Sequence, residues 1–163
     1  MSISADDQPY LNRAEGFLGL GMFKDAEAEL AKMSPALAAA PEVLVVRLSI
    51  YQEEQRWAAM QAAAHKLAAL DPGSFHWIVS LAYATRRAES IEAARAILMD
   101  ALDRFPTEAI IPYNLACYAC QLGDLGVARQ FLDIALRLAP EMKPMAREDE
   151  DLKPLWDSPE PAG

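Results

Sequence analysis

Three prolines recur at an interval of 34 residues along the chain, at Pro72, Pro106 and Pro140. Each follows an apolar segment with helical spacing, and proline ends a helix because it lacks an amide hydrogen and its ring clashes with the preceding turn. Self-similarity at a fixed period of this length is typical of proteins built from stacked repeats. The prolines therefore predict an array of helical repeats.

Four columns of apolar residues share the same 34-residue period. Small residues dominate the first two columns, where they let helix backbones approach while larger side chains fill the flanks. A turn lies between these two columns, with Gly21 in the first repeat, Gly123 in the last, and Gln55 and Glu89 in the middle repeats. The columns are Ala14, Leu48, Ala82 and Ala116; Ala26, Met60, Ala94 and Ala128; Leu30, Ala64, Leu98 and Leu132; Met33, Leu67, Ala101 and Ala135.

The columns divide each repeat into two helices joined by a tight connection, so the predicted fold class is all-α. Heavy use of Ala, Leu, Glu and Gln agrees with this class, because these residues favour helix. The sequence predicts helices near residues 8–20, 23–34, 41–54, 57–69, 75–87, 90–104, 109–121 and 125–138.

This pattern resembles the tetratricopeptide repeat family, whose repeat has small residues at two fixed positions and a proline near its end. The best match runs from Tyr113 to Ala128 and ends at Pro140, whereas the first repeat departs from the family at Arg13 and Ala38. The resemblance implies an α-α superhelix of four helix-turn-helix repeats. These are residues 7–40, 41–74, 75–108 and 109–142 (repeats 1 to 4).

The two ends of the chain differ in character from the repeats. Residues 1–6 and 158–163 are predicted to be disordered, and residues 143–157 to form a capping segment. An apolar stripe within it predicts one short helix over 145–156. Such a cap is needed because the last repeat would otherwise expose its apolar face to water. That face carries Val127, Phe131, Ile134 and Leu138.

Charge and composition exclude several classes of partner. A formal net charge of -9 without any Lys/Arg-rich run repels phosphate backbones, so no nucleic acid is expected as a partner. No uncharged apolar stretch approaches the ~18 residues of a membrane span, so no membrane association is expected. Cys117 and Cys120 are expected to be reduced thiols, which fits a cytoplasmic location.

The cysteine and histidine side chains do not form a catalytic pattern. Cys117 and Cys120 make a C-x-x-C motif, but the sequence has neither a second such pair nor the βαβ setting of redox proteins. His76, on the neighbouring first helix, is expected at a different height along the helix axis from Cys117, too far to share a metal. His65 and His76 have no Ser/His/Asp grouping around them. We therefore expect no enzyme activity, no cofactor and no metal, with any redox or metal role of the two cysteines left open.

The resemblance also implies where a partner would bind. In tetratricopeptide arrays the first helices of successive repeats line a concave groove that holds a peptide or a helix of a partner protein. By register, the partner-binding residues expected here are Glu15, Glu53, His76, Tyr83, Arg86, Arg87, Tyr113, Asn114 and Cys117. Tyr and Arg often anchor interfaces, so most of the affinity is expected in the C-terminal half of the groove.

Other functions of the same fold remain open from the sequence. The Lys/Asn clamp by which some family members hold chaperone C-termini is absent, because its register here reads Leu11, Glu15, Val46, His76 and Ser80. The resemblance to small bacterial repeat proteins leaves a secretion-type chaperone for a translocator protein as an alternative. Another alternative is a structural subunit that self-associates, for example as a homodimer, through exposed Tyr10, Phe17 and Phe23.

Overall fold

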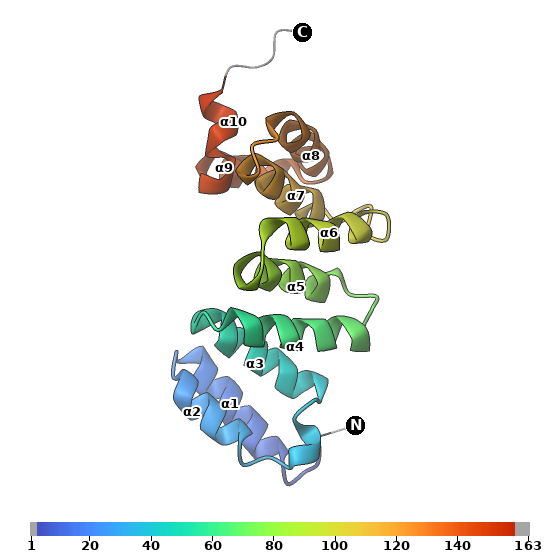
Figure 1. The fold of residues 1–163 in the computed structure, drawn as a ribbon. Coiled ribbons are helices and arrows are strands. Elements are labelled where there is room, and N and C mark those ends of the chain that lie inside the picture. Colours follow the sequence, from blue (N-terminus) through green and yellow to red (C-terminus); the bar gives the residue numbers. More distant parts are fainter. Residues whose placement is uncertain (1–2, 159–163) are drawn as a thin grey trace. The chain divides into compact units, whose positions relative to one another are not determined.

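The computed structural model describes residues 3–158, so the outermost residues of both predicted disordered ends, 1–2 and 159–163, lie outside the described residues. The chain divides into two compact units, an N-terminal unit Met1–Ala88 and a C-terminal unit Glu89–Gly163 (Figure 1). The division falls between the two helices of repeat 3. Each unit is therefore described by itself.

All regular secondary structure in the described residues is helical, and the predicted helices are present with ends that differ by at most a few residues. The N-terminal unit contains α1 (Gln8–Gly19), α2 (Phe23–Leu30), η1 (Pro35–Leu37), α3 (Pro41–Glu53), α4 (Trp57–Leu70) and α5 (Phe75–Ala88). The C-terminal unit contains α6 (Ile91–Leu102), α7 (Ile110–Gln121), α8 (Leu125–Leu138), η2 (Pro140–Met142), α9 (Lys143–Glu148), η3 (Glu150–Leu152) and α10 (Lys153–Asp157).

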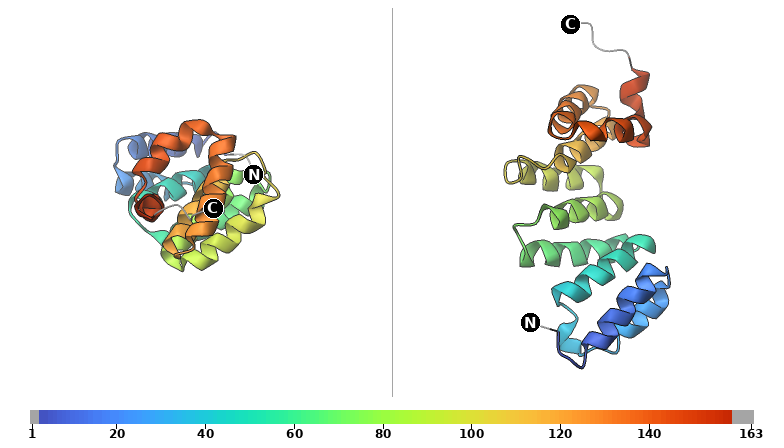
Figure 2. Two further views of the ribbon diagram at one scale, coloured as in Figure 1. Left: turned by 90° about the horizontal axis from the view of Figure 1, so that it is seen from above. Right: turned by 180° about the vertical axis from the view of Figure 1, so that it is seen from behind.

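Neighbouring helices pack in sequence order within each unit. In the N-terminal unit α1 lies against α2, α3 against α4, and α4 against α5, and in the C-terminal unit α6 and α8 both contact α7. Figure 2 shows the α1–α2 hairpin from behind, with its two helices side by side. Short connections between successive helices impose this antiparallel pairing.

The four repeating columns form the centres of these helix contacts. Every member of the columns is buried, and the most exposed of them, Leu48, has 7% of its surface exposed. Ala14, Ala82 and Ala116 are completely buried, as expected where a small side chain lets two helix backbones approach. The period read from the sequence therefore marks the core positions of both units.

Three turns between paired helices use a left-handed backbone conformation. Gly21 and Gly123 have φ angles of 70° and 82°, which glycine adopts without steric cost. Gln55 takes the same place in repeat 2 with a φ of 56° despite its side chain. In repeat 3, Glu89 stands at this place without a positive φ, and the Ser90 side chain caps α6 by accepting a hydrogen bond from the Ala93 amide at 3.1 Å.

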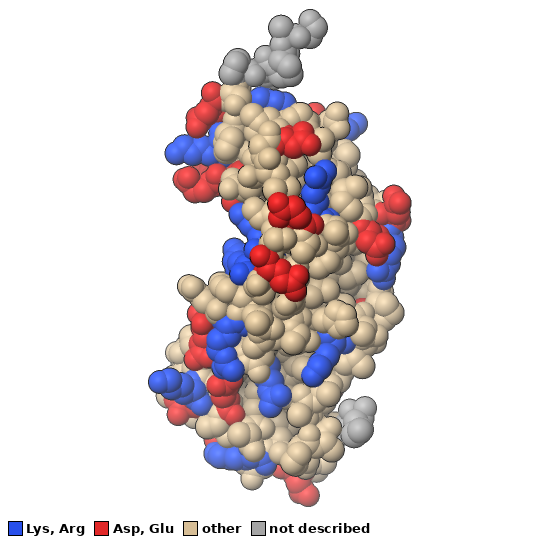
Figure 3. All heavy atoms as spheres, in the orientation of Figure 1, with Lys and Arg blue, Asp and Glu red and all other residues tan. Residues whose placement is uncertain are grey.

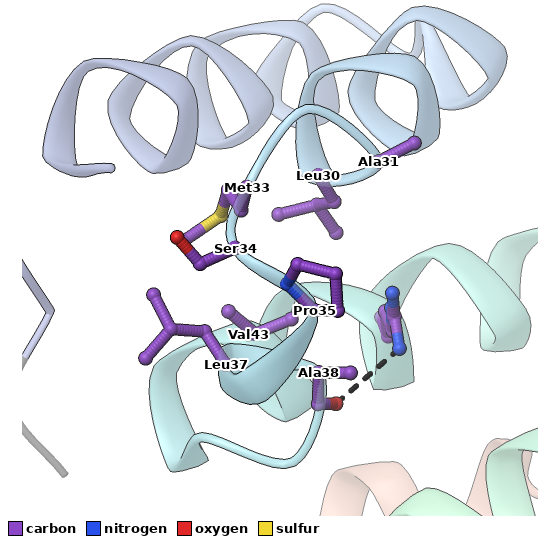
Figure 4. Close-up of a pocket in the computed structure, with 9 residues that line it drawn as sticks. Leu30, Ala31, Met33, Ser34, Pro35, Leu37, Ala38 and Val43 are labelled. Carbon is purple, nitrogen blue, oxygen red and sulfur yellow. Dashed lines mark hydrogen bonds between the residues drawn. The ribbon is translucent and has the colours of Figure 1, made fainter. Parts of the chain in front are cut away.

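The second helix of repeat 1 ends earlier than predicted, at Leu30, and η1 follows it. Pro35 begins η1, which leaves a cavity of about 180 Å³ between the end of α2 and α3 (Figure 4). Arg47 on α3 closes one side by donating a hydrogen bond to the Ala38 carbonyl at 3.3 Å. The cavity is smaller than the ~300–1,000 Å³ of typical ligand pockets, so it is a packing consequence of the shortened helix.

Residues 3–6, which were predicted to be disordered, form a turn that is held to repeat 1. The buried Asp7 carboxylate accepts hydrogen bonds from the Ser34 amide at 2.8 Å and from the Ser4 hydroxyl at 2.6 Å. These bonds lower the pKa of Asp7, first through Ser4 and then through Ser34. Ile3 packs against the apolar core of the unit, so residues 3–6 are held in place instead of being disordered.

The capping segment consists of two short helices with η3 between them, instead of the single helix predicted over 145–156. Asp149 has an extended backbone, with ψ of 116°, which separates α9 from η3. Leu152 and Leu155 are 0% and 2% exposed, and η3 packs against α7 while α10 packs against α8. Met145 remains 47% exposed, so it is not buried with Leu152 and Leu155 as the predicted apolar stripe implied.

Candidate functional site

The first helices of repeats 1 to 3 all belong to the N-terminal unit and carry six of the residues predicted to bind a partner. Glu15 on α1, Glu53 on α3, and His76 and Arg87 on α5 are exposed, whereas Tyr83 and Arg86 on α5 are half-buried. These side chains are therefore accessible or partly accessible within one compact unit.

Tyr83 and Arg87 form an ordered cluster with Trp57. The Arg87 guanidinium lies over the Tyr83 ring, with its Cζ 3.6 Å from the ring centroid, and 5.1 Å from the Trp57 centroid. The Trp57 and Tyr83 rings meet edge to face at 5.9 Å. Arg87 also donates a hydrogen bond to the Tyr83 carbonyl at 3.1 Å. Stacking on two aromatic faces orders the guanidinium and keeps its charge at the surface.

Local sequence explains the pairing of Tyr83 with Arg87 in this cluster. Tyr83 and Arg87 are four residues apart on α5, a spacing that places side chains on the same helix face. Trp57 begins α4, which packs against α5, and it also contacts the core cluster of this unit. The contact between Trp57 and Arg87 joins repeat 2 to repeat 3, so spacing along one helix gives no signal for it.

The acidic residues of the N-terminal unit fall into two groups. Glu27 and Glu54 both pair with Arg56, at 2.7 and 3.1 Å, and Glu29 pairs with Arg13 and Lys32. Within residues 3–158, neither Glu15 nor Glu53 forms a salt bridge. The first-helix positions therefore present carboxylates that are not neutralised by a neighbouring cation.

Charge of both signs is spread over the molecular surface. Figure 3 shows acidic and basic side chains interspersed in each unit on the face that it draws. The predicted exposed patch of Tyr10, Phe17 and Phe23 is half-buried, because all three pack against the core of repeat 1. Leu20 and Met22, at the turn between α1 and α2, are exposed apolar residues of the same repeat.

The three predicted residues on α7 lie in the C-terminal unit and have a different environment. Tyr113 and Cys117 are both 3% exposed, and Asn114 is half-buried. The Tyr113 hydroxyl donates a hydrogen bond to Asp149 at 2.7 Å, and the Cys117 thiol lies 3.8 Å from the same carboxylate. Residues 149–152 thus cover this face of α7, which the sequence had predicted to be an open part of the groove.

Two further contacts hold the capping segment on α7 and α8. Gln121 donates a hydrogen bond to the Asp151 carbonyl at 3.0 Å, and Arg129 donates one to the Leu155 carbonyl at 3.3 Å. Trp156 donates its indole N–H to the Ala146 carbonyl at 3.1 Å, which joins α10 to α9. The segment is therefore fixed by hydrogen bonds as well as by its buried leucines.

Burial controls the protonation of the α7 side chains. Burial raises the pKa of Tyr113 above its ordinary value, and the hydrogen bond to Asp149 raises it further, so the phenol stays protonated and donates. Burial also raises the pKa of the Cys120 thiol, which disfavours the nucleophilic thiolate.

The structure brings Cys117 together with Asp149 and Asp151, whose donor atoms all lie within 4.8 Å of one another. Both Asp149 oxygens already have protein partners, since Oδ2 accepts from Tyr113 and Oδ1 accepts from the Asp151 amide at 2.9 Å. Asp149 therefore caps η3 and holds the Tyr113 hydroxyl, and these two roles explain its position.

Comparison with known proteins identifies the fold. A solved structure titled "MamA MSR-1 C2", of a protein that contains tetratricopeptide repeats, matches with a TM-score of 0.64 at 16% identity, over 94% of this chain and 94% of that chain. The chain has a tetratricopeptide-like fold. No protein-family model matches the sequence, and a search of curated proteins finds no match.

The comparison confirms the predicted all-α, helical-repeat fold class. Within residues 3–158, none of the helices combines the length and the hydropathy that crossing a membrane requires.

Proposed function

We propose that this protein is an interaction module that binds a peptide or helix of a partner protein on the first helices of its N-terminal unit. The supporting observation is the Trp57–Tyr83–Arg87 cluster, which combines the three residue types most enriched at binding hot spots. Arg87 is already ordered by its two aromatic neighbours, so binding requires little additional loss of side-chain entropy.

The partner would place an acceptor or acidic group on Arg87 and an apolar group beside Tyr83. Glu15 and Glu53 would contribute polar contacts farther along the surface, because both are exposed and form no salt bridge within residues 3–158. Tyr113 and Cys117 would take no direct part while residues 149–152 cover them. We place the module in the cytoplasm, where buried cysteines such as Cys117 and Cys120 stay reduced.

Arg87→Glu tests this proposal by reversing one exposed charge in the cluster. Because Arg87 is exposed, folding should be preserved, with circular dichroism unchanged. In affinity capture from the lysate of cells that produce the protein, we expect the variant to recover the wild-type partner at least about tenfold less well, as for an interface hot spot.

Lys66→Glu on α4 is the matched control, because it reverses an exposed charge on a second helix. It should recover as much partner as the wild type. Equal recovery by Arg87→Glu and the wild type would refute the assignment of this surface.

A further inference from the structure

A second cavity lies entirely within the C-terminal unit and is independent of the proposed partner surface. It has a volume of about 360 Å³, opens to solvent and is lined by residues of α8, α9 and α10. Figure 1 shows the ribbons of α8, α9 and α10 in the C-terminal unit. Its size falls within the ~300–1,000 Å³ range of small-molecule sites.

The inner lining of the cavity is apolar. Leu132, Ala146 and Leu155 are buried, and Leu136 and Trp156 are half-buried. The Trp156 indole is held in place, because its N–H is bonded to the Ala146 carbonyl and its ring carries the Arg147 guanidinium 4.3 Å from its centroid. The lining therefore offers one ordered aromatic face and several aliphatic groups to an apolar ligand.

The rim of the cavity is positively charged, although the whole chain has a formal net charge of -9. Arg129, Lys143 and Arg147 line it against one acidic residue, Asp133. Within residues 3–158, neither Lys143 nor Arg147 forms a salt bridge, and Arg129 donates to the backbone carbonyls of Leu155 and Ser158. Two cations at the cavity are thus left without an anionic partner in the described residues.

We infer that this cavity binds a small organic anion, an aliphatic or aromatic carboxylate. Its apolar body lies on Leu132, Leu136 and Trp156, and its carboxylate lies at the rim beside Lys143 and Arg147. The combination of an apolar lining with a few charged groups at the rim is the usual composition of a small-molecule site.

The test uses 4-phenylbutyrate as the probe and 4-phenyl-1-butanol as its neutral counterpart, in low-salt buffer with the full chain. Binding is followed through the indole N–H resonances of Trp57, Trp77 and Trp156, with the last assigned from Trp156→Phe. We expect the carboxylate to shift the Trp156 resonance with a dissociation constant on the order of 1 mM, set by the number of atoms in the probe. The affinity for the alcohol should be at least about fivefold lower than that for the carboxylate.

Lys143→Glu should weaken 4-phenylbutyrate binding by about tenfold and leave the alcohol unaffected, because only the carboxylate needs the rim charge. Lys66→Glu, the same charge change on an exposed residue of the N-terminal unit, should alter neither affinity. The inference is overturned if carboxylate and alcohol bind equally, if the shifts occur at Trp57 or Trp77 instead, or if Lys143→Glu binds the carboxylate as well as the wild type.

Discussion

Leu152→Ala lowers the free energy of unfolding of the C-terminal unit by about 2–5 kcal/mol, the range for removing a fully buried leucine side chain. Leu152 is 0% exposed and lies in η3, which packs against α7. The truncation leaves a cavity at this contact, so the lost transfer energy and the lost packing add. Hydrogen exchange of the α7 and α8 amides measures the change, because it reports the stability of this unit separately.

Leu138→Ala is the matched control for this prediction. It removes the same atoms from the same unit, but Leu138 is 41% exposed, so we expect a loss below about 1 kcal/mol. Equal effects of the two substitutions would mean that residues 149–157 are not part of the core of the unit. The α7 face would then be open to solvent instead of covered by residues 149–152.

Asp149→Ala lowers the stability of the same unit by about 1–3 kcal/mol, because it leaves the buried Tyr113 hydroxyl without its acceptor. The substitution also removes the acceptor of the Asp151 amide, which begins η3. Hydrogen exchange of the α7 amides again provides the measurement. Asp100→Ala, an exposed aspartate on α6 of the same unit, should change the stability by less than about 0.5 kcal/mol.

A double-mutant cycle with Tyr113→Phe isolates the bond itself. Removing the hydroxyl also removes the need for an acceptor, so Asp149→Ala should cost less in the Tyr113→Phe background. We expect a coupling energy of about 0.5–3 kcal/mol, in the range for residues in direct contact. Strictly additive effects would show that the hydrogen bond does not hold the capping segment on α7.

The repeats were predictable because the same physical requirement recurs in each of them. A small or aliphatic residue is needed wherever two helices cross, so the requirement leaves a 34-residue signal from Ala14 to Ala135. Helix ends marked by Pro72, Pro106 and Pro140 were likewise predictable, because the constraint is local. The early end of α2 departs from the pattern, since Pro35 starts η1 before the position that the repeat would require.

The capping segment was less predictable because no period extends beyond Pro140. Its apolar stripe indicated helix, but Pro144 and Pro154 each lie in the first turn of a separate short helix. The bond between Tyr113 and Asp149 joins residues 36 apart in the sequence, and no local pattern encodes it. Register therefore placed Tyr113 and Cys117 in the predicted groove, but it could not indicate that residues 149–152 cover both side chains.

The Trp57–Tyr83–Arg87 cluster was predictable only in part. Register placed Tyr83 and Arg87 on one face of α5, and their spacing makes their stacking a local property of the helix. The contribution of Trp57 depends on how α4 packs against α5. The sequence indicates that these two helices are neighbours, but not which of their side chains meet. Such contacts between repeats decide which surface side chains are ordered.

Site-specific photo-cross-linking in the producing cells tests the proposed binding surface most directly. The photoreactive residue p-benzoylphenylalanine replaces Gln52, exposed on the first helix α3, or His65, exposed on the second helix α4. The account predicts one protein adduct from position 52, its loss when Arg87→Glu is added, and no such adduct from position 65. The same adduct from position 65, or an adduct from position 52 that persists with Arg87→Glu, would contradict it.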